Sequence, residues 1–439
     1  MTGSVLSSGQ AALILFGVFF FLIFMRVPIA FALALASLPI LLIEPHLGAM
    51  ALAQETFNAY NSFILLAVPF FLLTANLMNV GGITDRLVRL SRDMVGHWPG
   101  GLAQINVLLS VFFAGISGSS TADAASQSKI FIPAQRKEGY SDSFSAAITA
   151  VSSVLAVIMP PSILMIVWGG ILTVSIGALF LAGIVPALLL AAAQMATVHV
   201  YAKRRGYPTY PRATWTELFK AMIVSIPAMM TPFIIIGGKI FGWFTATEAA
   251  CIAVLYAAVL SIFVYREVSA AGLHSALLDS AKFAAIVLFC VGTASMFGWL
   301  LAYYRIPQAI LSGVQSWGMG PISTGFFISF AFLIVGCFLD AIPAIIIVGT
   351  ILQPLAASVG LDPVHFAIIG IVSLAFGLVT PPYGLCLLIA CSIAEIRMID
   401  ALKDVGIMLL PMLVVLALVI LFPDISLFLP RLVSPEFLN

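Results

Sequence analysis

Charge is scarce in this chain of 439 residues: only 8% of its residues are charged, whereas 62% are hydrophobic. A soluble domain carries about 25% charged residues, so the composition excludes a soluble globular protein and indicates a polytopic membrane protein. The lipid bilayer is therefore its first expected partner. The net charge of +1 implies no nucleic-acid or acidic-surface partner.

Residues that usually carry catalysis are also few. The five cysteines show no metal-ligand or redox spacing; they lie in apolar runs at positions 251, 290, 337, 386 and 391. The sequence has no Ser/His dyad, His-Glu zinc motif or paired Asp at a spacing that catalysis needs, so we expect no enzyme activity and no organic cofactor. No Arg or Lys lies deep in an apolar segment. An anionic substrate would therefore be recognised by hydroxyls, amides and helix ends, with bound cations supplying the charge.

Long apolar segments dominate what is present. A transmembrane helix needs about 20 apolar residues, and segments of this kind lie at about 9–25, 28–43, 62–80, 144–170, 177–201, 221–238, 245–265, 282–303, 364–392 and 405–423. Two further apolar stretches, at about 102–134 and 321–358, are interrupted at their centres by small or polar residues. We predict an all-α polytopic membrane protein with about ten spans and two re-entrant helical hairpins, or 12 apolar segments in all.

The first interruption, Phe112–Lys129, reads FFAGISGSSTADAASQSK, and the second comprises Gly336–Pro343. Irregular backbone at membrane depth is tolerated only where protein buries it or where it lines a watery cavity. Polar clusters at that depth mark substrate or ion pathways. We interpret both interruptions as hairpin tips; a cytoplasmic loop between two ordinary spans is the alternative for the first.

The distribution of basic residues tests this topology, because cytoplasmic loops carry an excess of Lys and Arg. With the N-terminus outside and both hairpins entering and leaving on one side, only Lys239, Arg305 and Arg431 of the 19 basic residues fall outside. A single crossing in place of one hairpin would reverse the orientation of every later segment. Replacing each hairpin by two full spans would leave every loop on the same side of the membrane. We therefore predict ten spans, with both termini outside.

This topology divides the chain into two halves of opposite orientation, 1–210 and 211–439. Each half has three spans, a hairpin, a span broken by a double proline (159–162 in the first half, 380–384 in the second) and a closing span. Ile83 precedes Pro160 by 77 residues, and Ile306 precedes Pro381 by 75. Inverted repeats of this kind are typical of secondary transporters, whose site lies at the repeat interface near the membrane midplane.

Both double prolines are predicted to help form cation sites. A proline inside a helix removes a backbone hydrogen bond and clashes with the preceding turn, which leaves carbonyl oxygens free to act as ligands of a small cation. Residues 117–120 facing 156–162 would form one site, and 336–340 facing 377–383 the other. A structural kink is the alternative for either pair taken singly.

Asp123 and Asp340 are the only carboxylates near the two tips. Each could be a cation ligand, a proton carrier or a helix cap. We expect charged surface segments as well: helices on the cytoplasmic face at 85–93, 203–220 and 266–282, with a solvated loop as the alternative for the second, which contains Pro208 and Pro211.

Several motifs together resemble those of the large membrane subunit of TRAP transporters (tripartite ATP-independent periplasmic transporters, DctM-like). They are GISGSSTAD, the PPS and TPPYG breaks, TATEAA, LFLAGIVP and GLDPVHFAIIG. The resemblance covers nearly the whole chain. It implies an elevator-type importer in the bacterial inner membrane that is driven by Na⁺. It also implies two partners, a small four-span membrane subunit and a periplasmic binding protein that delivers an organic acid.

The resemblance also assigns residues. It implies a first Na⁺ site at Ser117, Ala156, Met159 and Pro160, and a second at Gly336, Gly377, Thr380 and Tyr383. Substrate is expected to contact polar residues at the tips and breaks, namely Ser119, Ser120, Thr121, Asp123, Ser162, Asp340 and Ser373. The substrate would be a C4-dicarboxylate, a keto acid, a sugar acid or sialic acid.

Three other functions compete with this one. A stand-alone Na⁺- or H⁺-coupled anion symporter or exchanger with similar hairpins would need no binding protein. An intramembrane enzyme is disfavoured by the missing catalytic motifs. A passive channel is disfavoured because two closed hairpin tips suit alternating access better than a continuous pore.

Overall fold

The computed structural model describes residues 5–44, 46–315 and 317–438, and no β-strand occurs among them. Six described helices are long and apolar enough to cross a membrane singly; they are Ile176–Arg205, Trp215–Ile240, Ala246–Val264, Ala270–Tyr303, Ala341–Ser358 and Met398–Leu421. The other apolar segments form shorter helices. The predicted all-α polytopic membrane protein is confirmed.

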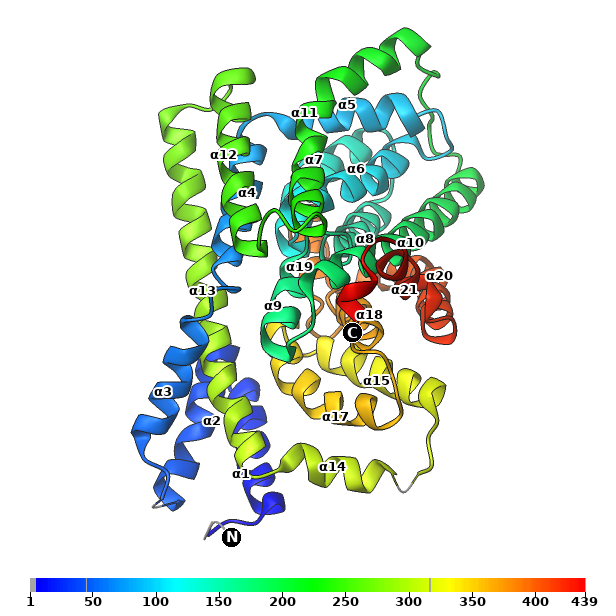
Figure 1. Cartoon of the computed structure of the whole chain (residues 1–439). Coiled ribbons are helices and arrows are strands. Elements are labelled where there is room, and N and C mark those ends of the chain that lie inside the picture. The colour runs from blue at the N-terminus through cyan, green and yellow to red at the C-terminus, as the bar shows by residue number, and fades with distance from the viewer. Residues whose placement is uncertain (1–4, 45, 316, 439) are drawn as a thin grey trace.

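One side of the molecule is built around the long helix α13 (Figure 1). Helices from the first and second halves of the chain pack against it or against one another there. They are α1 (Ser8–Phe24), α2 (Ile29–Ile43), α3 (Ala49–Tyr60), α4 (Ala67–Val80), α11 (Trp215–Ile240), α12 (Ala246–Val259) with its π-helical extension η2 (Leu260–Val264), and α13 (Ala270–Tyr303). We call this group of helices the frame.

The other side holds both interrupted stretches and both double prolines. Its first-half helices are α6 (Gly101–Ser117), α7 (Ser120–Lys137), α8 (Asp142–Ser153), η1 (Val154–Val157), α9 (Ile163–Leu172) and α10 (Ile176–Arg205). Its second-half helices are α15 (Pro321–Gly336), α16 (Ala341–Ala344), η3 (Ile345–Gly349), α17 (Thr350–Ser358), α18 (Pro363–Gly377), α19 (Leu385–Ala394), α20 (Met398–Leu421), α21 (Asp424–Val433) and η4 (Pro435–Leu438). We call this group the inner body.

Two short helices connect the frame to the inner body at opposite ends of α13, as Figure 1 shows. They are α5 (Ile83–Val95) and α14 (Ile306–Gln315). The chain bends by 73° between α4 and α5, so that α5 runs across the molecule. Both helices carry polar residues on one side and apolar residues on the other, as a helix at a membrane surface requires.

The two interrupted stretches are helix pairs. In the first, α6 and α7 are joined by a turn at Gly118 and Ser119; in the second, α15 is followed after a short break by α16, η3 and α17. Helices within each pair pack against each other. The breaks at residues 158–162 and 378–384 divide the predicted spans 144–170 and 364–392 into shorter helices, because a proline pair supplies no amide hydrogens to continue a helix.

Two expected surface segments differ from the structure. Residues 206–214 are not helical, whereas 203–205 end α10 and 215–220 begin α11, so the alternative of a loop is confirmed only for the middle of 203–220. Gly206 ends α10 in the left-handed region, and Pro208 and Pro211 prevent a restart. The expected separate helix at 266–282 is wrong, since α13 runs unbroken from Ala270 to Tyr303. No proline lies in that range to interrupt it.

Candidate functional site

The tip of the first hairpin rests directly on the break that follows the first double proline. The backbone amide of Ile163 donates to the carbonyl oxygen of Gly118 at 3.2 Å. Gly118 has a positive φ of 60°, and a Cβ there would lie 2.7 Å from the carbonyl oxygen of Pro161. Only glycine meets both conditions at this turn. The structure thus brings residues 117–120 to the segment 156–162, as the sequence predicted.

Asp123 lies in the first turn of α7 and is fully buried. The hydroxyl of Ser117 donates to its Oδ1, while its Oδ2 has no hydrogen-bond partner among the described residues. Among the residues that the structure describes, no basic side chain forms an ion pair with Asp123. Ser119, rather than Asp123, caps α7, since the Ser119 hydroxyl accepts from the amide of Ala122 at 3.5 Å.

A buried carboxylate with one open oxygen fits a small cation. Buried polar atoms are almost always hydrogen-bonded, and a buried charge is normally paired or bound to a metal ion. The one hydrogen-bond partner of the Asp123 side chain is the hydroxyl of Ser117, and hydroxyl and carboxylate oxygens are hard ligands suited to such an ion. Among the described residues, no group of three or more His, Cys, Asp or Glu side chains could hold a metal ion.

The second hairpin meets the second break through its backbone. The amide of Tyr383 donates to the carbonyl oxygen of Cys337 at 2.9 Å. Next to this contact, Gly336 of α15 crosses Gly377 of α18 so closely that a Cβ on Gly377 would lie 2.5 Å from the carbonyl carbon of Gly336. Thr380 donates its hydroxyl to the carbonyl oxygen of Phe376 at 2.6 Å. Residues 336–340 and 377–383 are therefore neighbours, as the sequence predicted.

Asp340 differs from Asp123 in its role within the fold. It is the N-cap of α16, where its Oδ1 accepts from the amide of Ala341 at 2.8 Å. Its side chain also lines a cavity of about 600 Å³ between the inner body and the frame. The helix-cap alternative thus describes Asp340 in this structure and does not describe Asp123.

The cavity is the place where the two tips and the frame meet. The first tip contributes Gly118, Ser119, Ser120 and Thr121, the second tip contributes Asp340, and the second break contributes Tyr383. From the frame come α2 and α13, with Phe31, Phe289 and Cys290 among their lining residues. Among the residues that the structure describes, no Lys, Arg or His lines it. An anion bound there would be held by hydroxyls, backbone amides and any cation bound nearby.

Other predicted site residues lie outside the cavity lining. Ser162 is the N-cap of α9 and donates its hydroxyl to the carbonyl oxygen of Val157 at 2.7 Å. Ser373 is buried between α18 and α15, with its hydroxyl 2.9 Å from that of Ser329. The rest also lie outside the lining, and all are buried except the partly exposed Met159 and Thr380. They are Ser117, Asp123, Ala156, Met159, Pro160, Gly336, Gly377 and Thr380.

Sequence reasoning missed the frame side of the cavity. Phe31, Phe289 and Cys290 lie in ordinary apolar spans, where an aromatic side chain or a cysteine carries no signal of its own. Helix α13 could have been suspected only from its length, because a 34-residue helix extends about 50 Å and so passes the membrane midplane.

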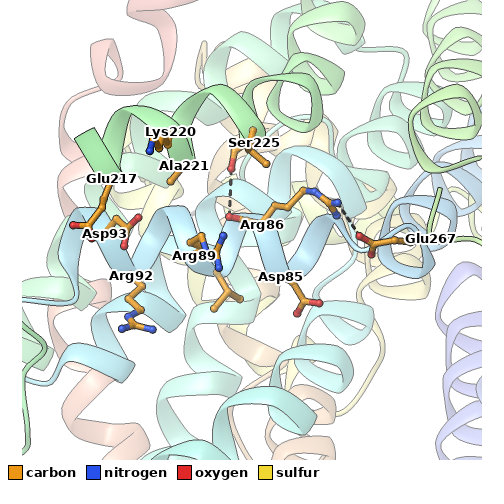
Figure 2. Close-up of a pocket in the computed structure, with 12 residues that line it drawn as sticks. Asp85, Arg86, Arg89, Arg92, Asp93, Glu217, Lys220, Ala221, Ser225 and Glu267 are labelled. Atoms are coloured by element: carbon orange, nitrogen blue, oxygen red, sulfur yellow. Dashed lines mark hydrogen bonds and ion pairs between the residues drawn. The ribbon is translucent and has the colours of Figure 1, made fainter. Parts of the chain in front are cut away.

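A larger cavity of about 760 Å³ lies between α5 and α11. Figure 2 shows that its walls carry both signs of charge, including Arg86, Arg89, Asp93 and Glu267. Arg86 forms an ion pair with Glu267 at 2.7 Å, and the carbonyl oxygen of Arg86 accepts from the hydroxyl of Ser225 at 3.3 Å. These contacts attach α5 to the frame, and the mixed charge gives no preference for an anion.

Comparison with known proteins shows a family match over nearly the whole chain. The family model described as tripartite ATP-independent periplasmic transporter, DctM component, matches residues 16–425. The sialic acid TRAP transporter large permease protein SiaM of Vibrio cholerae is 36% identical, covering 94% of this chain and 96% of that protein. The 2,3-diketo-L-gulonate TRAP transporter large permease protein YiaN of Escherichia coli is 34% identical, covering 95% and 98%. Among solved structures, the YdaH transporter of Alcanivorax borkumensis shares the fold, with a TM-score of 0.57 over 85% of this chain and 88% of that chain at 13% identity.

Proposed function

This chain belongs to the DctM component family of tripartite ATP-independent periplasmic transporters, and we propose that it imports an organic acid together with Na⁺. The observation that carries the proposal is the cavity between the two hairpin tips and the frame. It offers hydroxyls and backbone amides but no basic side chain, and the buried Asp123 behind it has an open carboxylate oxygen. An anion would therefore accept hydrogen bonds from the groups that line the cavity, and a cation would bind the open carboxylate oxygen of Asp123.

The cation would be Na⁺ at two positions. Asp123, Ser117 and the carbonyls near Ala156–Pro160 would hold one ion, and Gly336, Gly377, Thr380 and Tyr383 would hold the other. Both cation sites lie close behind the cavity. The positive charge of the bound ions would attract the carboxylate of a substrate, because this attraction is strong over a short distance at a low dielectric constant. The anion would be a C4-dicarboxylate, a keto acid, a sugar acid or sialic acid.

Transport would follow an elevator mechanism in which the inner body moves against the frame. Residues 1–210 and 211–439 would be inverted repeats, each with a hairpin, a broken span and a closing span. The matching contacts from break to tip, Ile163 to Gly118 and Tyr383 to Cys337, support this division. Helices α5 and α14, at opposite ends of α13, would carry the inner body between its two positions.

Two further proteins would complete the system in the bacterial inner membrane. A small four-span membrane subunit would pack beside this chain, and a periplasmic binding protein would deliver the substrate. Both assignments rest on family membership, since SiaM, YiaN and other relatives are named as large permease proteins of TRAP transporters.

Uptake into proteoliposomes tests the function. With this chain, its small subunit and the cognate binding protein, we expect accumulation of one radiolabelled organic acid only when an inward Na⁺ gradient is imposed. The physical reason is that cation binding at the tips must precede favourable binding of an anion in a cavity without basic residues. C4-dicarboxylates, keto acids, sugar acids and sialic acid would be offered in turn.

Other outcomes of this experiment have distinct meanings. Gradient-driven uptake without the binding protein would contradict the tripartite assignment and favour a stand-alone symporter. Uptake driven by a proton gradient and indifferent to Na⁺ would contradict the two cation sites. Liposomes containing the small subunit alone provide the control.

Substrate protection of Cys290 tests the position of the cavity. In a chain that keeps Cys290 as its single cysteine, we expect a membrane-permeant maleimide to react more slowly when Na⁺ and the transported acid are present, because the bound acid covers the thiol. Measured by mass spectrometry, the labelling rate should fall about tenfold, as it would if substrate occupies about 90% of the sites. A chain that keeps only Cys251, which is also half-buried but lies outside the cavity, should show no protection. Equal protection of both thiols would contradict the assignment.

A further inference from the structure

A separate cavity of about 680 Å³ lies between α10 and α20 of the inner body. It shares no lining residue with the substrate cavity. Three of its lining residues are basic, Arg204 and Arg205 at the end of α10 and Lys403 near the start of α20, and none is acidic. All other parts of the lining are apolar or weakly polar, including Ala196, Val200 and Ile407.

The basic and apolar parts occupy different levels of this cavity. Along α10, Ala196 lies eight residues before Arg204, which corresponds to about 12 Å at the rise of an α-helix. Ile407 lies one turn along α20 from Lys403. Val200 and Ile407 are 52% and 37% exposed, so they offer apolar surface to a neighbouring molecule. The cavity thus has a cationic end and an apolar body, which is the layout of an amphiphile with a negative head.

Protein groups leave most of the positive charge at the cationic end unpaired. Arg204 and Lys403 form no ion pair with an acidic side chain among the described residues. Arg205 lies 3.9 Å from Asp404, but that carboxylate already accepts hydrogen bonds from the hydroxyls of Tyr201 and Ser143.

The charged end is also predicted to lie on the side where anionic lipid is found. The distribution of basic residues places Lys203–Arg205 and Lys403 on the cytoplasmic side, and the cytoplasmic leaflet carries the negative surface potential. Basic pockets between transmembrane helices at this level bind phospholipid head groups. The α5–α11 cavity also has basic residues, but its four acidic side chains remove the preference for an anion.

From these observations, we propose that the cavity between α10 and α20 binds an anionic phospholipid of the cytoplasmic leaflet. The phosphate lies against Arg204, Arg205 and Lys403, and the first part of the acyl chains lies along Ala196, Val200 and Ile407. Because α20 packs on α8 and α10 packs on α9 and α18, the lipid is attached to the same body as the hairpin tips. The site is independent of the substrate and of the cations proposed above.

Native mass spectrometry of the purified full-length chain tests the proposal, with dioleoyl-phosphatidylglycerol as the probe. We expect the double variant R204Q/K403Q to bind this lipid about 30-fold more weakly, since each basic side chain near an anionic lipid contributes a factor of about five. The matched double variant K203Q/K137Q removes two exposed charges outside the cavity and should bind like the original chain. A phosphatidylglycerol with a photoreactive acyl chain should crosslink to peptides of α10 or α20.

A second variant tests the apolar part and does not depend on charge. A196W fills the cavity body, and we expect it to lose the crosslink while keeping its thermal transition. Unchanged phosphatidylglycerol affinity in R204Q/K403Q, or equal affinity for dioleoyl-phosphatidylcholine in the original chain, would overturn the proposal. So would displacement of the lipid by millimolar inorganic phosphate with the crosslink absent, which would indicate a site for free phosphate instead.

Discussion

Replacing Asp123 by asparagine is expected to abolish Na⁺-dependent uptake while leaving the protein folded. The carboxylate is fully buried, has one hydrogen bond from Ser117 and has an open Oδ2. Asparagine keeps the shape and the acceptor for Ser117 but removes the charge that a bound cation would neutralise. Transport should fall at least about 100-fold, as expected when a buried ion loses its charged ligand at a cost of about 3 kcal/mol or more. Uptake into proteoliposomes measures this loss.

Thermal unfolding separates loss of a cation site from loss of the fold. In the original chain, Na⁺ at 100 times its Kd should stabilise the protein by about 2.7 kcal/mol for each site and raise the Tm. In D123N the contribution of the first site should be absent, so that only the smaller Na⁺ response of the second proposed site remains. Without Na⁺ the Tm of D123N should equal or exceed that of the original chain, because an uncompensated buried charge has been removed.

The control for this prediction is D279N, which changes an exposed aspartate on α13 and should alter neither uptake nor the effect of Na⁺ on the Tm. A Tm response to Na⁺ that is as large in D123N as in the original chain would place the first cation elsewhere and contradict the role given to this residue. A D123N variant that fails to fold even in the absence of Na⁺ would mean that the carboxylate is structural.

Much of the inner body could be predicted, because its tips and breaks contain residues that an ordinary apolar span does not contain. A double proline cannot continue a helix, and serines and glycines at membrane depth need a protein or water environment. These two rules located the tips near Ser117 and Gly336 and the breaks near Pro160 and Pro381. The same rules could not orient the chain in the membrane, so the cytoplasmic placement of α5 stays a prediction.

Details that depend on neighbouring backbone could not be predicted. Asp123 and Ser119 are both good N-cap residues by type; Ser119 is the cap because it alone has the extended conformation, with φ −130° and ψ 113°, before α7. Ser373 resembles a binding residue in the sequence, yet its hydroxyl forms a hydrogen bond with that of Ser329 on α15, which lies 44 positions away in the chain. The frame wall of the cavity consists of apolar residues in apolar spans, which local patterns do not distinguish from lipid-facing ones.

Replacing Gly377 by alanine is expected to destabilise the protein and to reduce uptake strongly. A Cβ at this position would lie 2.5, 2.6 and 2.8 Å from three backbone atoms of Gly336, so no side-chain rotation can relieve the clash. Helices α15 and α18 would have to separate, which moves Thr380 and Tyr383 away from the second hairpin. Overpacking of this kind costs about 1–3 kcal/mol, and more where backbone must move. The Tm and the rate of Na⁺-dependent uptake measure the two effects.

The matched control is G406A in α20, because a Cβ on Gly406 has no heavy atom within 4 Å. Alanine is favoured over glycine inside a helix by about 0.5–1 kcal/mol, so this variant should be as stable as the original chain or more so. Opposite signs for the same chemical change at Gly377 and Gly406 would show that the contact with Gly336, rather than helix propensity, sets the effect. If G377A retained its Tm but lost uptake, the close crossing would matter for cation binding and not for the fold. If it retained both, the close crossing of α15 and α18 would not be required, and the second cation site would have to be assigned to other residues.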